Sequence, residues 1–226
     1  MEPVLPHPDL EELISALKTS PDWQMRAEAA FLLGESRENR GVRFLIDALK
    51  DGSGHVRSEA ASALGKLGNR GAAEPLISAL KDPAWQVRRS AAQALGRLGD
   101  VRAVPALIEV LKSIAAFQVR GSAALALGKL GDKQALIPLL ETLKQDPVWQ
   151  MRQLAALTLA ELRDPQALAP LIEALNDPQL EVKNCAAFVL GEIGPSYVLA
   201  PLKAALKDGE LRETALSAIE KIRSRA

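Results

Sequence analysis

Apolar residues recur at helical spacing along the whole chain, in pairs of short segments separated by polar turns. Within residues 71–100 the first segment contains an apolar set on one helical face: Leu76, Ile77 and Leu80. After a turn at residues 81–83, the second segment has the same period: Val87, Ala91, Ala92 and Leu95. The pattern therefore predicts two helices joined by a tight turn.

This two-helix pattern repeats along the chain. A basic residue follows an apolar one early in each second segment, and these residues mark the register: Arg26, Arg57, Arg88, Arg120, Arg152, Lys183 and Arg212. Successive marks are 31, 31, 32, 32, 31 and 29 residues apart by their numbers. We expect a single domain of seven repeats, over residues 8–38, 39–69, 70–100, 101–132, 133–164, 165–194 and 195–226.

Turn and small residues support the same division. Three aspartates precede a proline in the turn and are suited to cap the second helix: Asp82, Asp146 and Asp177. We interpret Gly96 and Gly99 as stops at the end of a second helix. Pairs of alanines, such as Ala91 and Ala92, would let second helices of adjacent repeats approach closely.

The pattern D-P-x-x-x-V-R-x-x-A-A-x-A-L-G-x-L-G-D, with A-x-x-P-L-I-x-A-L after it, resembles the HEAT repeats. It is most similar to the short subtype of phycobilisome lyases and many bacterial and archaeal scaffolds, over essentially all 226 residues. The resemblance implies an all-α, right-handed α-solenoid with second helices lining its concave side. It also implies that Arg57, Arg88 and Arg152 tie neighbouring repeats through a turn aspartate.

One stripe of each second helix falls outside the packing pattern. It lies three positions before, one after and five after the register residue, and the family's geometry places it in the concave groove. With one flanking glutamine, we predict these partner-binding residues: Trp23, Phe31, Trp85, Arg89, Phe117, Leu125, Trp149, Gln150, Gln153, Leu157 and Phe188. The tryptophans have two interpretations, as binding anchors or as covers over the end of their own or the next repeat's helix.

Composition narrows the function. Lysine plus arginine equals aspartate plus glutamate at 28 each, which disfavours nucleic acid or an anionic membrane as partner. The one cysteine, Cys185, cannot form an internal disulfide, and no apolar run has the length of a membrane span. We expect a cytoplasmic protein without a membrane partner.

Catalytic chemistry is sparse. The two histidines, His7 and His55, cannot form a metal cluster, and we expect no metal or other cofactor. The motif "GKLGNRG" lacks the spacing of a phosphate loop and follows a helix, so we interpret it as a helix stop. Cys185 is either a nucleophile or a buried inert thiol, and no histidine is near it in sequence.

Three function classes remain. The leading hypothesis is a non-enzymatic scaffold for protein–protein interaction, whose concave groove receives a helix or segment of another protein and could also support self-association. The alternative is a phycobilisome-lyase-like chaperone or bilin lyase subunit, which the resemblance implies. A DNA-binding protein of the alkylation-repeat type is similar in architecture, but it requires a basic concave face, and Arg89 is the only cation on the main stripe.

Overall fold

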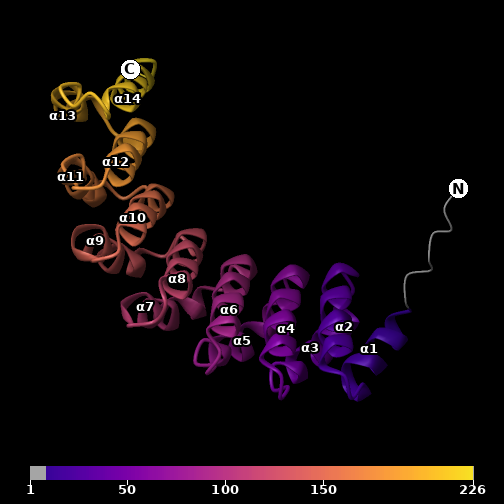
Figure 1. Ribbon diagram of the computed structural model, residues 1–226. Helices are drawn as coiled ribbons and strands as arrows, with labels where there is room; N and C mark the ends of the chain where they lie inside the picture. Colours follow the sequence, from indigo (N-terminus) through magenta and orange to yellow (C-terminus); the bar gives the residue numbers. More distant parts are fainter. Residues whose placement is uncertain (1–8, 226) are drawn as a thin grey trace, which may run out of the picture. The chain divides into compact units, whose positions relative to one another are not determined.

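The computed structural model describes residues 9–225, and these contain α-helices and short 3-10 turns but no strands. The first helices of the repeats are α1 (Leu10–Thr19), α3 (Val42–Ala48), α5 (Ala73–Ala79), α7 (Val104–Lys112), α9 (Leu136–Gln145), α11 (Leu168–Ala174) and α13 (Leu199–Ala205). The second helices are α2 (Trp23–Glu35), α4 (Gly54–Leu67), α6 (Trp85–Leu98), α8 (Phe117–Leu130), α10 (Trp149–Leu162), α12 (Leu180–Ile193) and α14 (Arg212–Arg223), as labelled in Figure 1. The expected all-α solenoid of two-helix repeats is confirmed.

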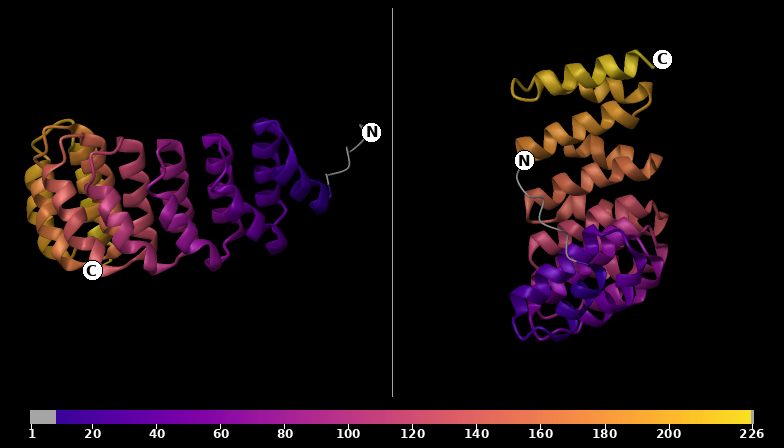
Figure 2. Two further views of the ribbon diagram at one scale, coloured as in Figure 1. Left: turned by 90° about the horizontal axis from the view of Figure 1, so that it is seen from below. Right: turned by 90° about the vertical axis from the view of Figure 1, so that its right-hand side faces the viewer.

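The helices group into two compact bodies. Among the described residues, the N-terminal body comprises 9–110 together with 114–126, and the C-terminal body comprises 111–113 together with 127–225. In the N-terminal body α4 packs between α2 and α6, and in the C-terminal body α12 packs between α10 and α14. Figure 2 shows these second helices side by side within each body. The expectation of one continuous domain with the stated repeat boundaries stays a prediction.

The core is built from leucine and alanine. Leu64, Leu95 and Leu159 are fully buried in three different second helices, and the paired alanines are all buried, Ala91 and Ala92 completely. Because alanine adds little bulk, neighbouring second helices can approach one another closely. The packing role predicted for the alanine pairs agrees with this burial.

Glycines inside the second helices allow the closest approach between repeats. A Cβ on Gly65 would lie 2.7 Å from the Cα of Ala94, and one on Gly34 would lie 2.8 Å from that of Ala63. Gly96 occupies the same position in α6 and is buried within the helix. Its interpretation as a helix stop is therefore wrong, since the helix continues to Leu98. Gly99, with φ at +67°, does end α6 in the left-handed conformation.

Ion pairs connect successive repeats through residues 25 positions apart. Arg57 Nε lies 2.7 Å from Asp82 Oδ2 and its Nη2 lies 2.9 Å from Oδ1, which makes a bidentate bond. Arg26 binds Asp51 in the same way, and Arg152 binds Asp177. In α12 a lysine, Lys183, stands at the position of the arginine, and its Nζ lies 2.8 Å from Asp208 Oδ2. The predicted role of Arg57 and Arg152 holds.

Arg88 departs from this rule. The residue 25 positions after it is Ser113, so the required carboxylate is missing from the sequence. Arg88 Nη1 instead donates to carbonyl oxygens of its own turn, at 2.7 Å to Asp82 and 2.9 Å to Pro83. The prediction that Arg88 ties repeats through a turn aspartate is wrong.

The turn aspartates act one step earlier than predicted. Asp82 Oδ1 accepts the backbone N–H of Ala84 at 2.8 Å, and Asp146 Oδ1 accepts that of Val148 at 3.0 Å. Ala84 and Val148 are themselves the N-cap residues of α6 and α10, and neither makes a side-chain cap. The aspartates therefore close the turn ahead of the helix. Asp82 in addition accepts the guanidinium of Arg57 from the preceding repeat.

Candidate second-helix interaction face

Every second helix of the predicted stripe starts at its first stripe position. Trp23, Trp85 and Trp149 are the first residues of α2, α6 and α10, and Phe117 is the first residue of α8. Residues four and eight positions later extend the same helical face. The stripe is consequently one row per helix, and in α2, α6, α8 and α10 an aromatic residue begins the row beside the turn.

Most of the predicted side chains are accessible. The large apolar residues of the stripe are between 39% and 52% exposed: Trp23, Phe31, Trp85, Phe117, Leu125, Leu157 and Phe188. The polar residues Arg89 and Gln150 are exposed, and Gln153 is half-buried. Trp149 is also half-buried, so it is less accessible than the other two tryptophans.

The beginning of the N-terminal body supports the covering interpretation of the tryptophan. The indole of Trp23 stacks on the imidazole of His55 in the next repeat, with ring centroids 4.8 Å apart and planes inclined by 24°. Phe31 lies under the ammonium of Lys66, 4.4 Å from its ring centroid. Both residues thus serve the junction between α2 and α4 while part of each ring stays exposed.

Between α6 and α8 the stripe makes a different surface. Trp85, Arg89 and Gln93 follow one another at intervals of one helical turn along α6, and all three are exposed. Gln93 Nε2 reaches Ser122 Oγ at 3.5 Å, which places the two helices side by side in the N-terminal body. Phe117 and Leu125 contribute apolar area on the α8 side.

In the C-terminal body α10 and α12 bring a second apolar set together. Leu157 and Phe188 occupy equivalent positions on these adjacent helices and are exposed. Trp149 and Leu180 occupy the equivalent positions at the starts of α10 and α12 and are half-buried. This surface holds apolar side chains at both ends of each row, with Gln153 in the middle of one row.

Cys185 faces the interior. It is 7% exposed, and its Sγ donates to the backbone carbonyl of Gln153 at 3.4 Å. Burial raises the pKa of the thiol to about 12, despite an opposing backbone hydrogen bond. A thiol that stays protonated is a poor nucleophile, so the inert interpretation of Cys185 fits the geometry.

Other chemical sites are limited. Within residues 9–225 no group of at least three His, Cys, Asp or Glu side chains could hold a metal ion. His7 lies outside the described residues, and His55 is engaged by Trp23. Across the same residues, no helix combines the length and apolar character needed to span a bilayer.

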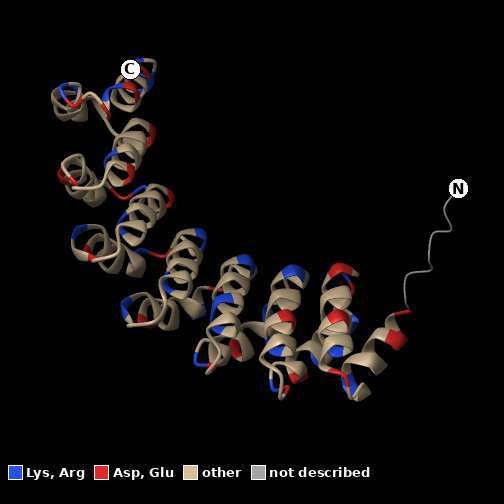
Figure 3. Ribbon diagram, in the orientation of Figure 1, with Lys and Arg blue, Asp and Glu red and all other residues tan. Residues whose placement is uncertain are grey.

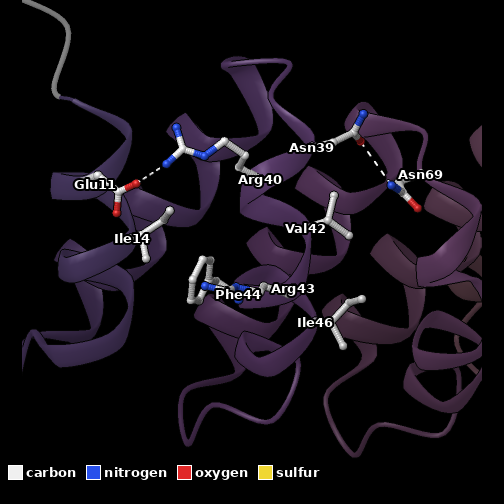
Figure 4. Close-up of a pocket in the computed structure, with 9 residues that line it drawn as sticks. All are labelled: Glu11, Ile14, Asn39, Arg40, Val42, Arg43, Phe44, Ile46 and Asn69. Carbon is white, nitrogen blue, oxygen red and sulfur yellow. Dashed lines mark hydrogen bonds and ion pairs between the residues drawn. The ribbon is translucent and has the colours of Figure 1, made fainter.

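The described cavities lie away from the predicted stripe. One of about 500 Å³ is lined in the N-terminal body by residues of α1 and α3 with neighbouring turns, and Figure 4 shows Glu11 bound to Arg40 and Asn39 bound to Asn69 at its edge. One of about 450 Å³ in the C-terminal body includes Tyr197. Sequence reasoning predicted neither cavity, because residues of successive repeats form their walls.

Comparison with known proteins identifies the repeat type. The family model of the HEAT repeats matches residues 10–83, 73–159 and 138–223. No curated protein sequence shows a significant match. The CpcE–CpcF complex of phycocyanin lyase from Nostoc sp. PCC7120 is similar, with 29% sequence identity, a TM-score of 0.65, and coverage of 100% of this chain and 98% of that chain.

Other solved structures share the architecture. The YibA protein of Escherichia coli is 25% identical with a TM-score of 0.69, over 95% of this chain and 81% of that chain. Importin beta is 14% identical with a TM-score of 0.67, over 96% of this chain and 35% of that chain, which speaks for the fold alone.

Proposed function

Because the chain belongs to the HEAT-repeat family, we propose that it is a non-enzymatic scaffold that binds a helix or segment of another protein on its second-helix face. The proposed contact residues are those of the predicted stripe. A single repeat cannot bury its apolar face alone, so repeats must stack on one another. Stacking explains the residues packed between repeats, but it does not determine the residues of the stripe.

The observation that carries the proposal is the row of exposed aromatic and aliphatic side chains at positions the packing does not use. Trp85, Phe117 and Leu125 are exposed in the N-terminal body, and Leu157 and Phe188 are exposed in the C-terminal body. Water favours polar residues at such positions, whereas clustered apolar side chains on a surface are typical of interaction sites. Tryptophan is especially frequent among residues that dominate binding energy.

A second candidate is a lyase-type chaperone, in which the same face would hold an open-chain tetrapyrrole or the helix that bears it. Its support is the 29% identity to the phycocyanin lyase complex over the full chain. The buried Cys185 does not suit covalent attachment of a bilin to this chain. Addition of an open-chain tetrapyrrole should then produce a shifted visible absorbance that depends on Trp149 and Phe188 but leaves no covalent adduct.

The scaffold proposal is tested by cross-linked affinity capture from the source cells, quantified by mass spectrometry. The wild type is compared with Trp85→Ala/Phe117→Ser and with Trp149→Ala/Phe188→Ser. Ile137→Ser is the matched control, because Ile137 is an exposed apolar residue on first helix α9. We expect one set of captured proteins to be lost with a stripe variant and kept with the control.

Equal capture by all variants would contradict the proposal. Sedimentation at increasing protein concentration tests self-association through the same residues, which the stripe variants should also weaken. We place the protein in the cytoplasm as part of this proposal, since its one cysteine forms no disulfide.

A further inference from the structure

The second helices α6 and α8 carry basic residues and no acidic ones. α6 contains Arg88, Arg89 and Arg97, and α8 contains Arg120 and Lys129. Figure 3 shows this difference from α2, α4 and α12, which carry red segments as well as blue ones. The whole chain has no net charge, so these two helices are basic in composition relative to the rest of the chain.

Arg89 is the basic residue that stands in the middle of the apolar stripe. It is exposed, and within residues 9–225 it makes no hydrogen bond or ion pair. The register arginines Arg57 and Arg152, by contrast, are held by bidentate bonds to aspartates. The guanidinium of Arg89 therefore keeps all its donors for a partner.

Short residues flank Arg89 on both sides. The equivalent positions on the neighbouring helices are Ser58 in α4 and Gly121 in α8. The Ser58 hydroxyl is occupied by Ser90, with an Oγ to Oγ distance of 3.0 Å, and Gly121 has no side chain. No long side chain therefore stands at the equivalent positions of the two adjacent rows, which leaves the exposed guanidinium open to a partner from those two sides.

Exposed apolar side chains belong to the same stripe on α6 and on α8. Trp85 lies one turn before Arg89, while Phe117 and Leu125 lie on α8. A partner that covers these residues also removes water from the guanidinium, and an arginine that loses water without gaining a counter-ion is unfavourable. A carboxylate satisfies it through two parallel hydrogen bonds.

We propose that the α6–α8 surface binds an amphipathic helix whose apolar face carries one Asp or Glu that pairs with Arg89. One turn separates Arg89 from Trp85 and from Gln93 on α6, which matches a partner helix with its acid one turn from an apolar residue. The inference rests on the proposed scaffold function and names the chemistry of the occupant.

A displayed library of helix-forming peptides of about 16 residues, long enough for four turns, tests the inference. Positions on the apolar face are randomised, and the full-length protein is the bait. We expect selected peptides to carry an acidic residue between apolar ones. A resynthesised peptide should bind Arg89→Gln about tenfold more weakly or worse, and its acid-to-lysine form should bind Arg89→Glu better than it binds the wild type.

The matched control is Arg70→Gln, which removes one exposed cation from the turn before α5 and should leave peptide affinity unchanged. Apolar peptides without an acid, insensitive to Arg89→Gln but lost with Trp85→Ala/Phe117→Ser, would overturn the inference and leave the scaffold function standing. Selected peptides whose affinity is unchanged by both Arg89→Gln and Trp85→Ala/Phe117→Ser would overturn the inference and the proposed scaffold function. A single-stranded oligonucleotide is added as a competitor of the selected peptide. If it displaces the peptide with equal affinity, and if its binding is lost in Arg89→Gln, the surface binds nucleic acid instead.

Discussion

Helices α6 and α10 begin with nearly the same four residues, yet they differ in what holds them and in what they present. Arg152 of α10 makes a bidentate bond to Asp177, while Arg88 of α6 bonds only to carbonyls of its own turn. Four residues after the tryptophan, α6 presents Arg89 and α10 presents Gln153. One turn further on, α6 presents Gln93 and α10 presents Leu157. The repeat thus fixes the two helices, whereas the ion pair of the register arginine and the stripe residues each vary from helix to helix.

The ends of the two helices differ as well. α6 carries Arg97 in its last turn, and α10 carries Glu161 at the equivalent position. A basic residue at a helix C-terminus is favoured by the helix dipole and an acidic one is not. Helix stability therefore does not explain why α10 has an acidic residue at position 161. We interpret the charge at this position as a property of the surface that each helix exposes.

The ion pair gives the largest expected difference between the two helices. Arg152→Met leaves Asp177 partly buried without its guanidinium partner, and we expect a loss of about 2 kcal/mol in the free energy of unfolding. Arg88→Met removes only bonds to carbonyls and should cost less than about 1 kcal/mol. Urea unfolding at neutral pH measures both, and equal losses would contradict the distinction.

Acid should reduce the difference. Burial alone would raise the pKa of Asp177, but hydrogen bonds from Arg152 and from the backbone N–H of Gln179 outweigh it and hold that pKa below its ordinary 3.8. A lowered pKa gives stability that is present above the unfolded value and is lost as pH falls through the folded one. Wild type should therefore lose more stability than Arg152→Met below about pH 4, and Arg88→Met should follow the wild-type slope.

The glycine contacts supply the next comparison. A Cβ on Gly65 would lie 2.7 Å from the backbone Cα of Ala94 in α6, while the nearest atom to one on Gly128 would be a side-chain atom, the Cγ2 methyl of Thr158 in α10, at 2.7 Å. Gly65→Ala should cost about 1–2 kcal/mol, because overpacking against backbone exceeds the gain in helix propensity. Gly128→Ala should cost less and be rescued by Thr158→Ser. Gly52→Ala, with open space around it, is the control for thermal melting.

The two-helix repeat could be predicted from sequence because its causes are local or strictly periodic. Spacing and residue type predicted the two helices of residues 71–100 and the helix stop at Gly99. The resemblance to HEAT repeats implied that Arg57 binds a turn aspartate, which is Asp82. The failure at Arg88 was also readable, since Ser113 occupies the aspartate position. The close approach of second helices at glycine could also be predicted, because Gly34, Gly65 and Gly96 recur at one position of the repeat. The interpretation of such glycines as helix stops missed it.

The state of each stripe residue could not be predicted, because it depends on side chains of the next repeat. Trp23 is stacked on His55, Trp85 is exposed, and Trp149 is half-buried, although the three begin their helices identically. Periodicity assigns a residue to a face but does not say how far a neighbour covers it.

Trp85 and Trp149 should therefore respond differently to truncation to alanine. Trp149 is half-buried, so Trp149→Ala should lower the free energy of unfolding by about 1 kcal/mol through lost apolar burial. Trp85 is more exposed, and Trp85→Ala should cost less than half of that while still weakening a partner on the α6–α8 surface. Parallel thermal melts and binding titrations separate the two effects. A larger stability loss for Trp85→Ala would show that the indole is a packing element.

The smallest expected effect concerns the ends of the same two helices. α6 ends at Gly99 with φ at +67°, and α10 ends at Arg163 with φ at +49°. A side chain in this left-handed conformation is strained by about 1 kcal/mol, part of which glycine returns as greater freedom of the unfolded chain. Arg163→Gly should consequently stabilise the protein by about 0.5 kcal/mol, and Gly99→Ala should destabilise it by about 1 kcal/mol. Arg163→Ala removes the guanidinium while keeping the strain, so a gain equal to that of Arg163→Gly would trace the effect to the lost charge and not to the backbone.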